Sequence, residues 1–161
     1  ARSLAAMVER TREYARFYLR PLKGVDMHRR FTVDGKDLNT AYWLVAHMTV
    51  SQNWLLLRST GGPFEKFSWA KYFNIGSTPT ATELCPPYEE VWTMFKLVHE
   101  KSAGHLATLT AEQLDQPHQG APLVIPGMTT VRDIIMHHCR HEALHTGQLA
   151  WLCKLHGKAT V

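Results

Sequence analysis

The C-terminal part of the chain constrains the fold most, because it predicts one long helix with clear ends. Apolar and histidine side chains recur every three or four residues from Val131 to Leu152, the periodicity of a helix with one buried face. Thr130 precedes this stretch, and Asp133 three residues later completes a capping-box pattern. The sequence therefore predicts an amphipathic helix that begins at Thr130 and ends before Gly157.

The same periodicity predicts three further helices, over residues 3–19, 39–59 and 86–109. Asn39 is the expected N-cap of the second helix, and the prolines at 86 and 87 suit the first turn of the third. The stretch 60–85 is long enough to return along a whole helix and to leave helices 2 and 3 parallel. The expected fold is all-α, a four-helix bundle with a long crossover between helices 2 and 3.

The length and composition favour one globular domain over residues 1–161, with a proper core. Aromatic residues gather between 64 and 73 inside the crossover, and we expect a helical turn there that packs as a lid or as a satellite cluster. The apolar stretches are too short to span a membrane. The net charge of +4 comes from scattered basic residues without a nucleic-acid motif, so we expect no nucleic-acid partner.

The cysteine count bears on the cell compartment. The chain has three cysteines, Cys85, Cys139 and Cys153, and none of them forms a C-x-x-C pair. An odd number without such a pair is typical of reduced, mostly buried thiols. We therefore expect a cytoplasmic protein in which Cys139 and Cys153 fill the core.

The predicted C-terminal helix carries His141-Glu142-x-x-His145, a spacing that places two imidazoles one turn apart on the same face. In zinc proteases with this motif, the glutamate is the general base and a third metal ligand is required. The 16 residues after His145 contain no Asp or Glu, and Trp151 stands where the extended motif has its last histidine. We therefore expect no such protease, and we expect any third ligand to lie upstream.

His47 is the upstream candidate, because it lies on the apolar stripe of the second predicted helix. An imidazole in a core needs a hydrogen-bond partner or a metal ion. Three imidazoles on facing helices, His47, His141 and His145, favour a shared metal, and a three-histidine site leaves a position open for water or substrate. The alternative is that they are ordinary core histidines, the commoner role of a single inward histidine. His138 shares the stripe and is a candidate to support a ligand.

The chain resembles the DinB-like (DinB/YfiT-like) superfamily of metalloenzymes. The resemblance rests on His47 within WLVAHMTVSQNWLL and on the H-x-x-x-H-x-G-Q pattern of the last helix, and it covers nearly the whole chain. It implies a four-helix bundle in up-down-down-up order and a homodimer. It also implies that His47, His141 and His145 bind a divalent metal, zinc or nickel, with water in the open positions.

Some relatives resemble transferases that use a low-molecular-weight thiol such as bacillithiol, which implies a metal-dependent S-transferase acting on a small-molecule substrate. The metal would lower the pKa of a bound thiol or water and so produce a nucleophile. Two alternatives stay open. One is a metal-dependent hydrolase, and the other is a non-catalytic, metal-binding dimeric protein.

Three residues are candidates to support the site. Glu142 could hydrogen-bond a ligand, act as a general base, or be a solvated or interface charge. Gln148 could orient a ligand or hold the helix packing, and Ser51, one turn after His47, could touch the pocket. A thiol with carboxylates would need a basic group at the pocket mouth, for which Arg58 and Arg140 are candidates.

Overall fold

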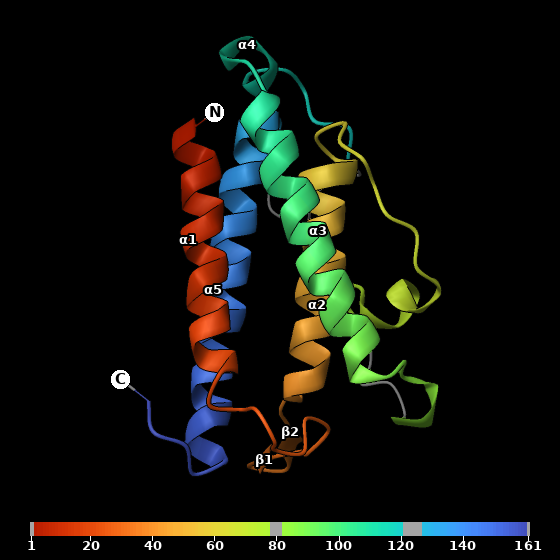
Figure 1. Ribbon diagram of the computed structural model, residues 1–161, viewed down its shortest axis with the longest axis vertical. Coiled ribbons are helices and arrows are strands. Elements are labelled where there is room, and N and C mark those ends of the chain that lie inside the picture. The colour runs from red at the N-terminus through yellow and green to blue at the C-terminus, as the bar shows by residue number, and fades with distance from the viewer. Residues whose placement is uncertain (1, 78–81, 121–126, 161) are drawn as a thin grey trace.

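The computed structural model describes residues 2–77, 82–120 and 127–160, and these form a bundle of four long helices (Figure 1). The long helices are α1 (Arg2–Leu19), α2 (Ala41–Gln52), α3 (Tyr88–Thr108) and α5 (Val131–Leu155). The shorter elements are β1 (Thr32–Val33), β2 (Lys36–Asp37), η1 (Asn53–Arg58), η2 (Ser68–Phe73), η3 (Thr82–Leu84) and α4 (Ala111–Leu114). The predicted all-α class is confirmed.

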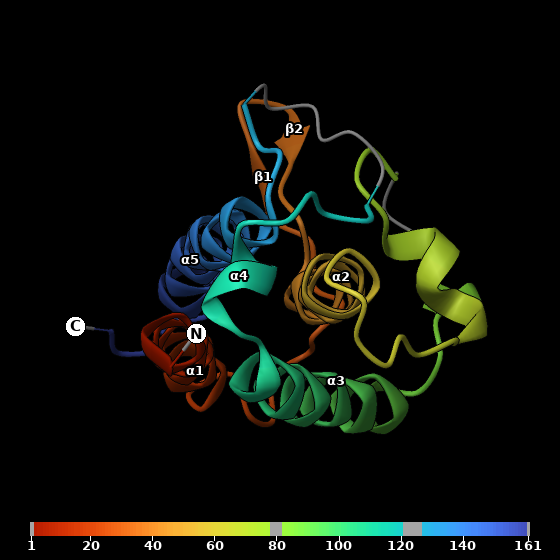
Figure 2. The same ribbon diagram turned by 90° about the horizontal axis from the view of Figure 1, so that it is seen from above.

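The direction of the helices follows from their connections. In Figure 1, α1 and α5 run downward, whereas α2 and α3 both run upward, so the long connection between α2 and α3 returns along the bundle. Seen from above, α1 packs against α5 and α3, and α2 packs against the same two helices (Figure 2). Among the described residues, no helix combines the length and apolar character needed to cross a bilayer.

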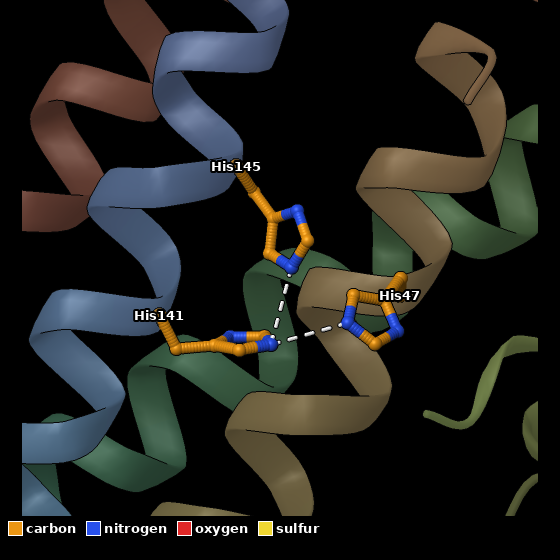
Figure 3. A group of neighbouring side chains, drawn as sticks. All are labelled: His47, His141 and His145. Carbon is orange, nitrogen blue, oxygen red and sulfur yellow. Dashed lines mark hydrogen bonds between the residues drawn. The ribbon is translucent and has the colours of Figure 1, made fainter. Parts of the chain in front are cut away.

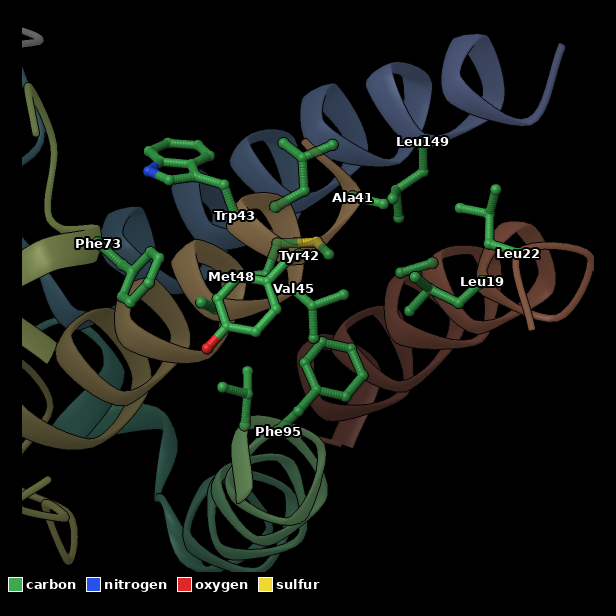
Figure 4. Packing of buried hydrophobic residues seen from close by; sticks show 14 of the residues in the cluster. Leu19, Leu22, Ala41, Tyr42, Trp43, Val45, Met48, Phe73, Phe95 and Leu149 are labelled. Carbon is green, nitrogen blue, oxygen red and sulfur yellow. The ribbon is translucent and has the colours of Figure 1, made fainter. Parts of the chain in front are cut away.

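Helix α2 is the most enclosed of the long helices, with every residue from Ala41 to Gln52 buried. Its neighbours are α3, α5 and the short helix η2 in the crossover. Figure 4 shows Phe73 of η2, Phe95 of α3 and Leu19 of α1 in the cluster around α2. The helical turn expected in the aromatic segment is therefore present, and Trp69 and Phe73 belong to the main core rather than to a satellite cluster.

The helix ends follow local capping rules. Thr130 Oγ1 accepts from the Asp133 backbone N–H and the Asp133 side chain accepts from that of Thr130, so the predicted capping box of α5 is confirmed. The N-cap of α2 is Thr40 and not Asn39, because the Thr40 hydroxyl accepts from the backbone N–H of Trp43. The predicted second helix continues past α2 as the π-helix η1, ending at Arg58.

Two connections are held by specific contacts. Asp34 and Gly35, with φ of 47° and 72°, form the two-residue turn between β1 and β2, the geometry that suits a tight hairpin. The Asn53 side chain donates to the carbonyl of Glu65 and accepts from its N–H, which ties the crossover to the start of η1. The crossover also contacts the side of α2 that carries His47, through the carbonyl oxygen of Phe73.

Candidate metal centre

Three histidines from α2 and α5 meet in the bundle with their Nε2 atoms turned toward one another (Figure 3). His141 Nε2 lies 3.2 Å from His47 Nε2 and 3.1 Å from His145 Nε2. His47 and His145 are buried, with 3% and 7% of their surface exposed, and His141 is half-buried. The structure therefore brings together the three side chains that the sequence singled out.

The backbone explains how the three rings converge. His141 and His145 lie one turn apart on α5, so both rings project from the same face of the helix. That face packs against α2, and His47, the seventh residue of α2, projects toward the two rings. The centroid of the His47 ring lies 5.1 Å from that of the His141 ring and 4.7 Å from that of the His145 ring.

Two of the rings are oriented by hydrogen bonds at their other nitrogen. His47 Nδ1 donates to the carbonyl oxygen of Phe73 at 2.7 Å, and His145 Nδ1 donates to Gln148 Oε1 at 3.0 Å. Since both oxygens can only accept, the hydrogen of each neutral ring lies on Nδ1 and its Nε2 carries a lone pair. Trp43 stacks on the His47 ring, 4.4 Å away and nearly parallel, which fixes that ring further.

This donor set fits a metal ion better than it fits an ordinary core contact. The lone pairs of His47 and His145 both face His141 Nε2, and a single hydrogen there can be directed at only one of them. His141 Nδ1 is buried without a partner among the described residues in either tautomer, so the conflict lies at the three Nε2 atoms. One cation between the three nitrogens satisfies all of them, as in metal sites whose ligands are held by outer hydrogen bonds.

Burial also favours the neutral form that binds metal. Desolvation lowers the pKa of His47 to about 4, and the neighbouring His145 adds to this effect. Burial and the adjacent histidines lower the pKa of His141 to about 3, and burial lowers that of His145. Near neutral pH all three imidazoles are therefore uncharged, and their Nε2 lone pairs are available to a cation.

The family model of the DinB superfamily matches residues 7–149, a range that includes all three histidines and nearly all of the bundle. The chain belongs to the DinB superfamily. A comparison with curated proteins finds none that matches.

In this DinB-superfamily chain, the three histidines lie at one side of a pocket of about 630 Å³. The volume is in the range typical of small-molecule sites. Trp43, Ile75 and Leu144 supply apolar walls, and Arg140 lines the pocket as an exposed cation. The Trp43 indole Nε1 is buried without a hydrogen-bond partner among the described residues. The pocket thus combines apolar walls with the three histidines and one exposed cation.

Of the supporting residues, two lie beside the histidines. Gln148 accepts from His145, and Ser51 Oγ lies 3.4 Å from His47 Nε2. Arg140 lines the histidine pocket, whereas Arg58 lies in η1 and is not among the residues that line it. Of the two basic residues considered for the pocket mouth, only Arg140 therefore lines the histidine pocket.

Glu142 faces a different part of the bundle and is neither solvated nor at the surface. Its side chain is 1% exposed, and its Oε2 accepts from Nη2 of the fully buried Arg12 at 2.9 Å. The two side chains also form an ion pair, with Arg12 Nε 2.7 Å from Oε1. Burial alone would raise the pKa of Glu142, but the charge of Arg12 and the contact with His138 outweigh it and lower this pKa to about 2. A carboxylate with so low a pKa is a weak base.

Arg12 and Glu142 belong to a buried polar network that sequence reasoning missed. Arg12 also donates to Gln52, Gln52 contacts His99, and the Nε2 of His99 lies 2.8 Å from Glu9. The network thus connects α1, α2, α3 and α5. A signal was present, since Arg12 lies four residues after the buried Val8 and three before the buried Ala15, on the inward stripe of its helix.

Proposed function

We propose that this member of the DinB superfamily is a divalent-metal-dependent enzyme whose ligands are His47, His141 and His145. The observation that carries the proposal is the convergence of three Nε2 atoms, two of them with their tautomers fixed, beside an open pocket. Zinc and nickel are the proposed metals, because neutral imidazole ligands suit both. Three protein ligands leave coordination positions for water or a substrate.

The proposed chemistry is transfer of a low-molecular-weight thiol, such as bacillithiol, to a small-molecule substrate. The bound metal would lower the pKa of the thiol and so hold it as a thiolate near neutral pH. The residues of the chain bind and orient the reactants: the guanidinium of Arg140 attracts a carboxylate of the thiol. Trp43, Ile75 and Leu144 exclude water from the apolar part of the substrate.

A metal-dependent hydrolase is the runner-up, and it needs a general base close to the histidines. Glu142 would have that role in a protease-like mechanism. Its pairing with Arg12 and its pKa of about 2 argue against it, and this favours thiol transfer over hydrolysis. The third candidate is a metal-binding protein without catalysis.

We also propose that the protein forms a homodimer. Leu144 and Trp151 lie two turns apart on α5 and each is 65% exposed, and Tyr14 on α1 is 66% exposed. Large apolar side chains on neighbouring surface helices are typical of interaction surfaces. The surface formed by Leu144, Trp151 and Tyr14 is here called the α1/α5 apolar face.

Metal content measured by mass spectrometry tests the ligand set. Protein purified without tag or chelator is expected to hold about one zinc or nickel ion per chain, and His47→Ala and His145→Ala are expected to lose most of it. His105→Ala is the matched control, because His105 contacts Thr60 and lies outside the three-histidine group. Metal retained in both ligand variants, or no metal after reconstitution, contradicts the proposal.

Activity of the metal-loaded protein separates the candidate functions. Transfer that requires an added thiol supports the S-transferase, whereas turnover of esters or amides without a thiol supports the hydrolase. Arg140→Gln is expected to raise the KM for a carboxylate-bearing thiol about tenfold, because one charge-assisted hydrogen bond is lost. It should leave the metal content unchanged.

A further inference from the structure

A second pocket, of about 770 Å³, lies where the C-terminal end of α1 and the turn after it meet the beginning of α3. It shares no lining residue with the histidine pocket, so the proposed metal chemistry does not account for it. Its volume is in the range of small-molecule sites. We refer to it as the α1/α3 pocket.

The inner wall of the α1/α3 pocket is apolar and aromatic. Leu19 and Leu22 are buried parts of the core and line the pocket, and Figure 4 shows both at the α1 side of the cluster. Tyr88 and Trp92 line the opposite side as half-buried side chains, with nearly parallel rings whose centroids lie 6.3 Å apart. Trp92 in turn stacks on the buried Phe95 at 5.2 Å. A flat ring or an acyl chain would contact this wall well.

The rim of the α1/α3 pocket carries positive charge without a partner. Arg16, Arg20 and Lys23 line it, and their side chains have no ion pair or hydrogen bond within the described part of the chain. Glu89 is the one acidic residue among the described residues that line the pocket. The rim therefore has a surplus of positive charge next to apolar surface, which favours an anion.

Neutral donors and an ordered turn complete the pocket. The Tyr88 hydroxyl and the Trp92 indole N–H have no hydrogen-bond partner among the described residues, and burial raises the pKa of Tyr88 to about 12, so it stays protonated. Successive backbone hydrogen bonds, from Lys23 N–H to Arg20 O and from Val25 N–H to Leu22 O, fix the turn. Groups that are already ordered lose little entropy when a ligand binds.

We propose that the α1/α3 pocket binds a small amphipathic carboxylate. Its carboxylate would accept from Arg16, Arg20 and Lys23, and its apolar body would lie between Leu22 and Trp92. Arginine suits this role because its planar donors match the two oxygens of a carboxylate. The ligand would bind at a site separate from the three histidines.

Octanoate is a suitable probe, and the Trp92 indole N–H resonance is a local readout. Titration of the metal-loaded protein with octanoate is expected to shift that resonance saturably in a heteronuclear NMR spectrum, with Trp92→Phe used to assign it. Octylamine has the same chain and the opposite charge, and it is expected to leave the resonance in place. Equal shifts with both compounds would show mere apolar partition and overturn the proposal.

Charge variants test the rim. Arg20→Gln combined with Lys23→Gln removes two exposed cations and is expected to weaken octanoate binding at least about tenfold. Arg2→Gln combined with Lys66→Gln is the matched control, because it removes the same charge from exposed positions outside the pocket. An equal loss in both pairs, or no saturable shift with the unmodified protein, contradicts a carboxylate site.

Discussion

At the scale of single residues, Arg12 and Glu142 form an ion pair that is completely enclosed by the bundle. Arg12 is 0% exposed, and its guanidinium also lies 3.8 Å from the centre of the Phe95 ring. Removing two charges from water is costly, so a buried pair adds little stability by itself. Removing one partner is different, because the other charge is then left buried without compensation.

Glu142→Gln is therefore expected to lower the free energy of unfolding by about 3–5 kcal/mol. The double variant Arg12→Met with Glu142→Leu is expected to recover most of this loss, since it buries no unpaired charge. Urea unfolding of the metal-free proteins measures both effects. If the free energy of unfolding of Glu142→Gln lies within about 1 kcal/mol of that of the unmodified protein, the ion pair is less enclosed than the structure shows.

The same pair predicts an acid-labile part of the stability. The pKa of Glu142 is lowered in the folded protein to about 2 from a usual 4.5, because Arg12 and His138 outweigh the effect of burial. A lowered pKa contributes stability that is fully present above pH 4.5 and is lost as the pH falls toward 2. As the pH is lowered from 4.5 to 2, the free energy of unfolding should therefore fall more steeply for the unmodified protein than for the double variant. Parallel curves for the two proteins would contradict the lowered pKa of Glu142.

At the scale of elements, α5 carries much of the site on a single rigid helix. Its start is fixed by the reciprocal hydrogen bonds of Thr130 and Asp133, and its histidines lie about three turns further along. The pKa of Asp133 is lowered by hydrogen bonds from the backbone N–H and side chain of Thr130 and from the backbone N–H of Thr129. The Asp133 carboxylate therefore stays charged in the capping box. The cap and the histidines are thus separate local features of one helix.

Loss of the cap should cost stability without loss of metal. Thr130→Ala is expected to lower the free energy of unfolding by about 1 kcal/mol, because one backbone N–H at the helix start loses its acceptor. Metal content should stay unchanged, since frayed residues lie far from His141. Thr129→Ala makes the same chemical change at an exposed position outside the box and is expected to cost less than about 0.5 kcal/mol.

At the scale of the whole molecule, some large apolar residues stay exposed on α1 and α5. Leu144, Trp151 and Tyr14 of the α1/α5 apolar face belong to the two helices that pack most extensively against each other. Contiguous exposed patches of large apolar residues typically mark interaction sites. The homodimer proposed above would cover them.

Sedimentation velocity tests this assembly. The unmodified protein is expected to sediment as a dimer, and Trp151→Glu as a monomer with unchanged metal content, because the charge would be buried at the interface without a partner. Leu84→Glu is a suitable control, since Leu84 is 57% exposed and lies in η3. A monomer in all three samples, or a dimer in all three, contradicts the proposed face.

Much of the fold was determined by the sequence alone, because helix periodicity and capping are local. Residues three or four apart must share a helix face, so the last helix, its capping box and the pairing of His141 with His145 could be predicted. His47 was predicted from the same rule on another helix. Predicted helix ends differed from those in the structure by one or two residues where neighbouring side chains could each serve as the cap, such as Asn39 and Thr40.

The surroundings of the histidines were decided only by the tertiary structure. Adjacent residues of a helix point about 100° apart, so Glu142 turns away from the face of His141 and meets Arg12, which lies 130 residues earlier in the chain. The acceptor for His47 is the backbone carbonyl of Phe73, which no side-chain pattern marks. The sequence determined which faces of the helices are buried, whereas packing determined which buried groups face each other, because that depends on contacts between distant segments.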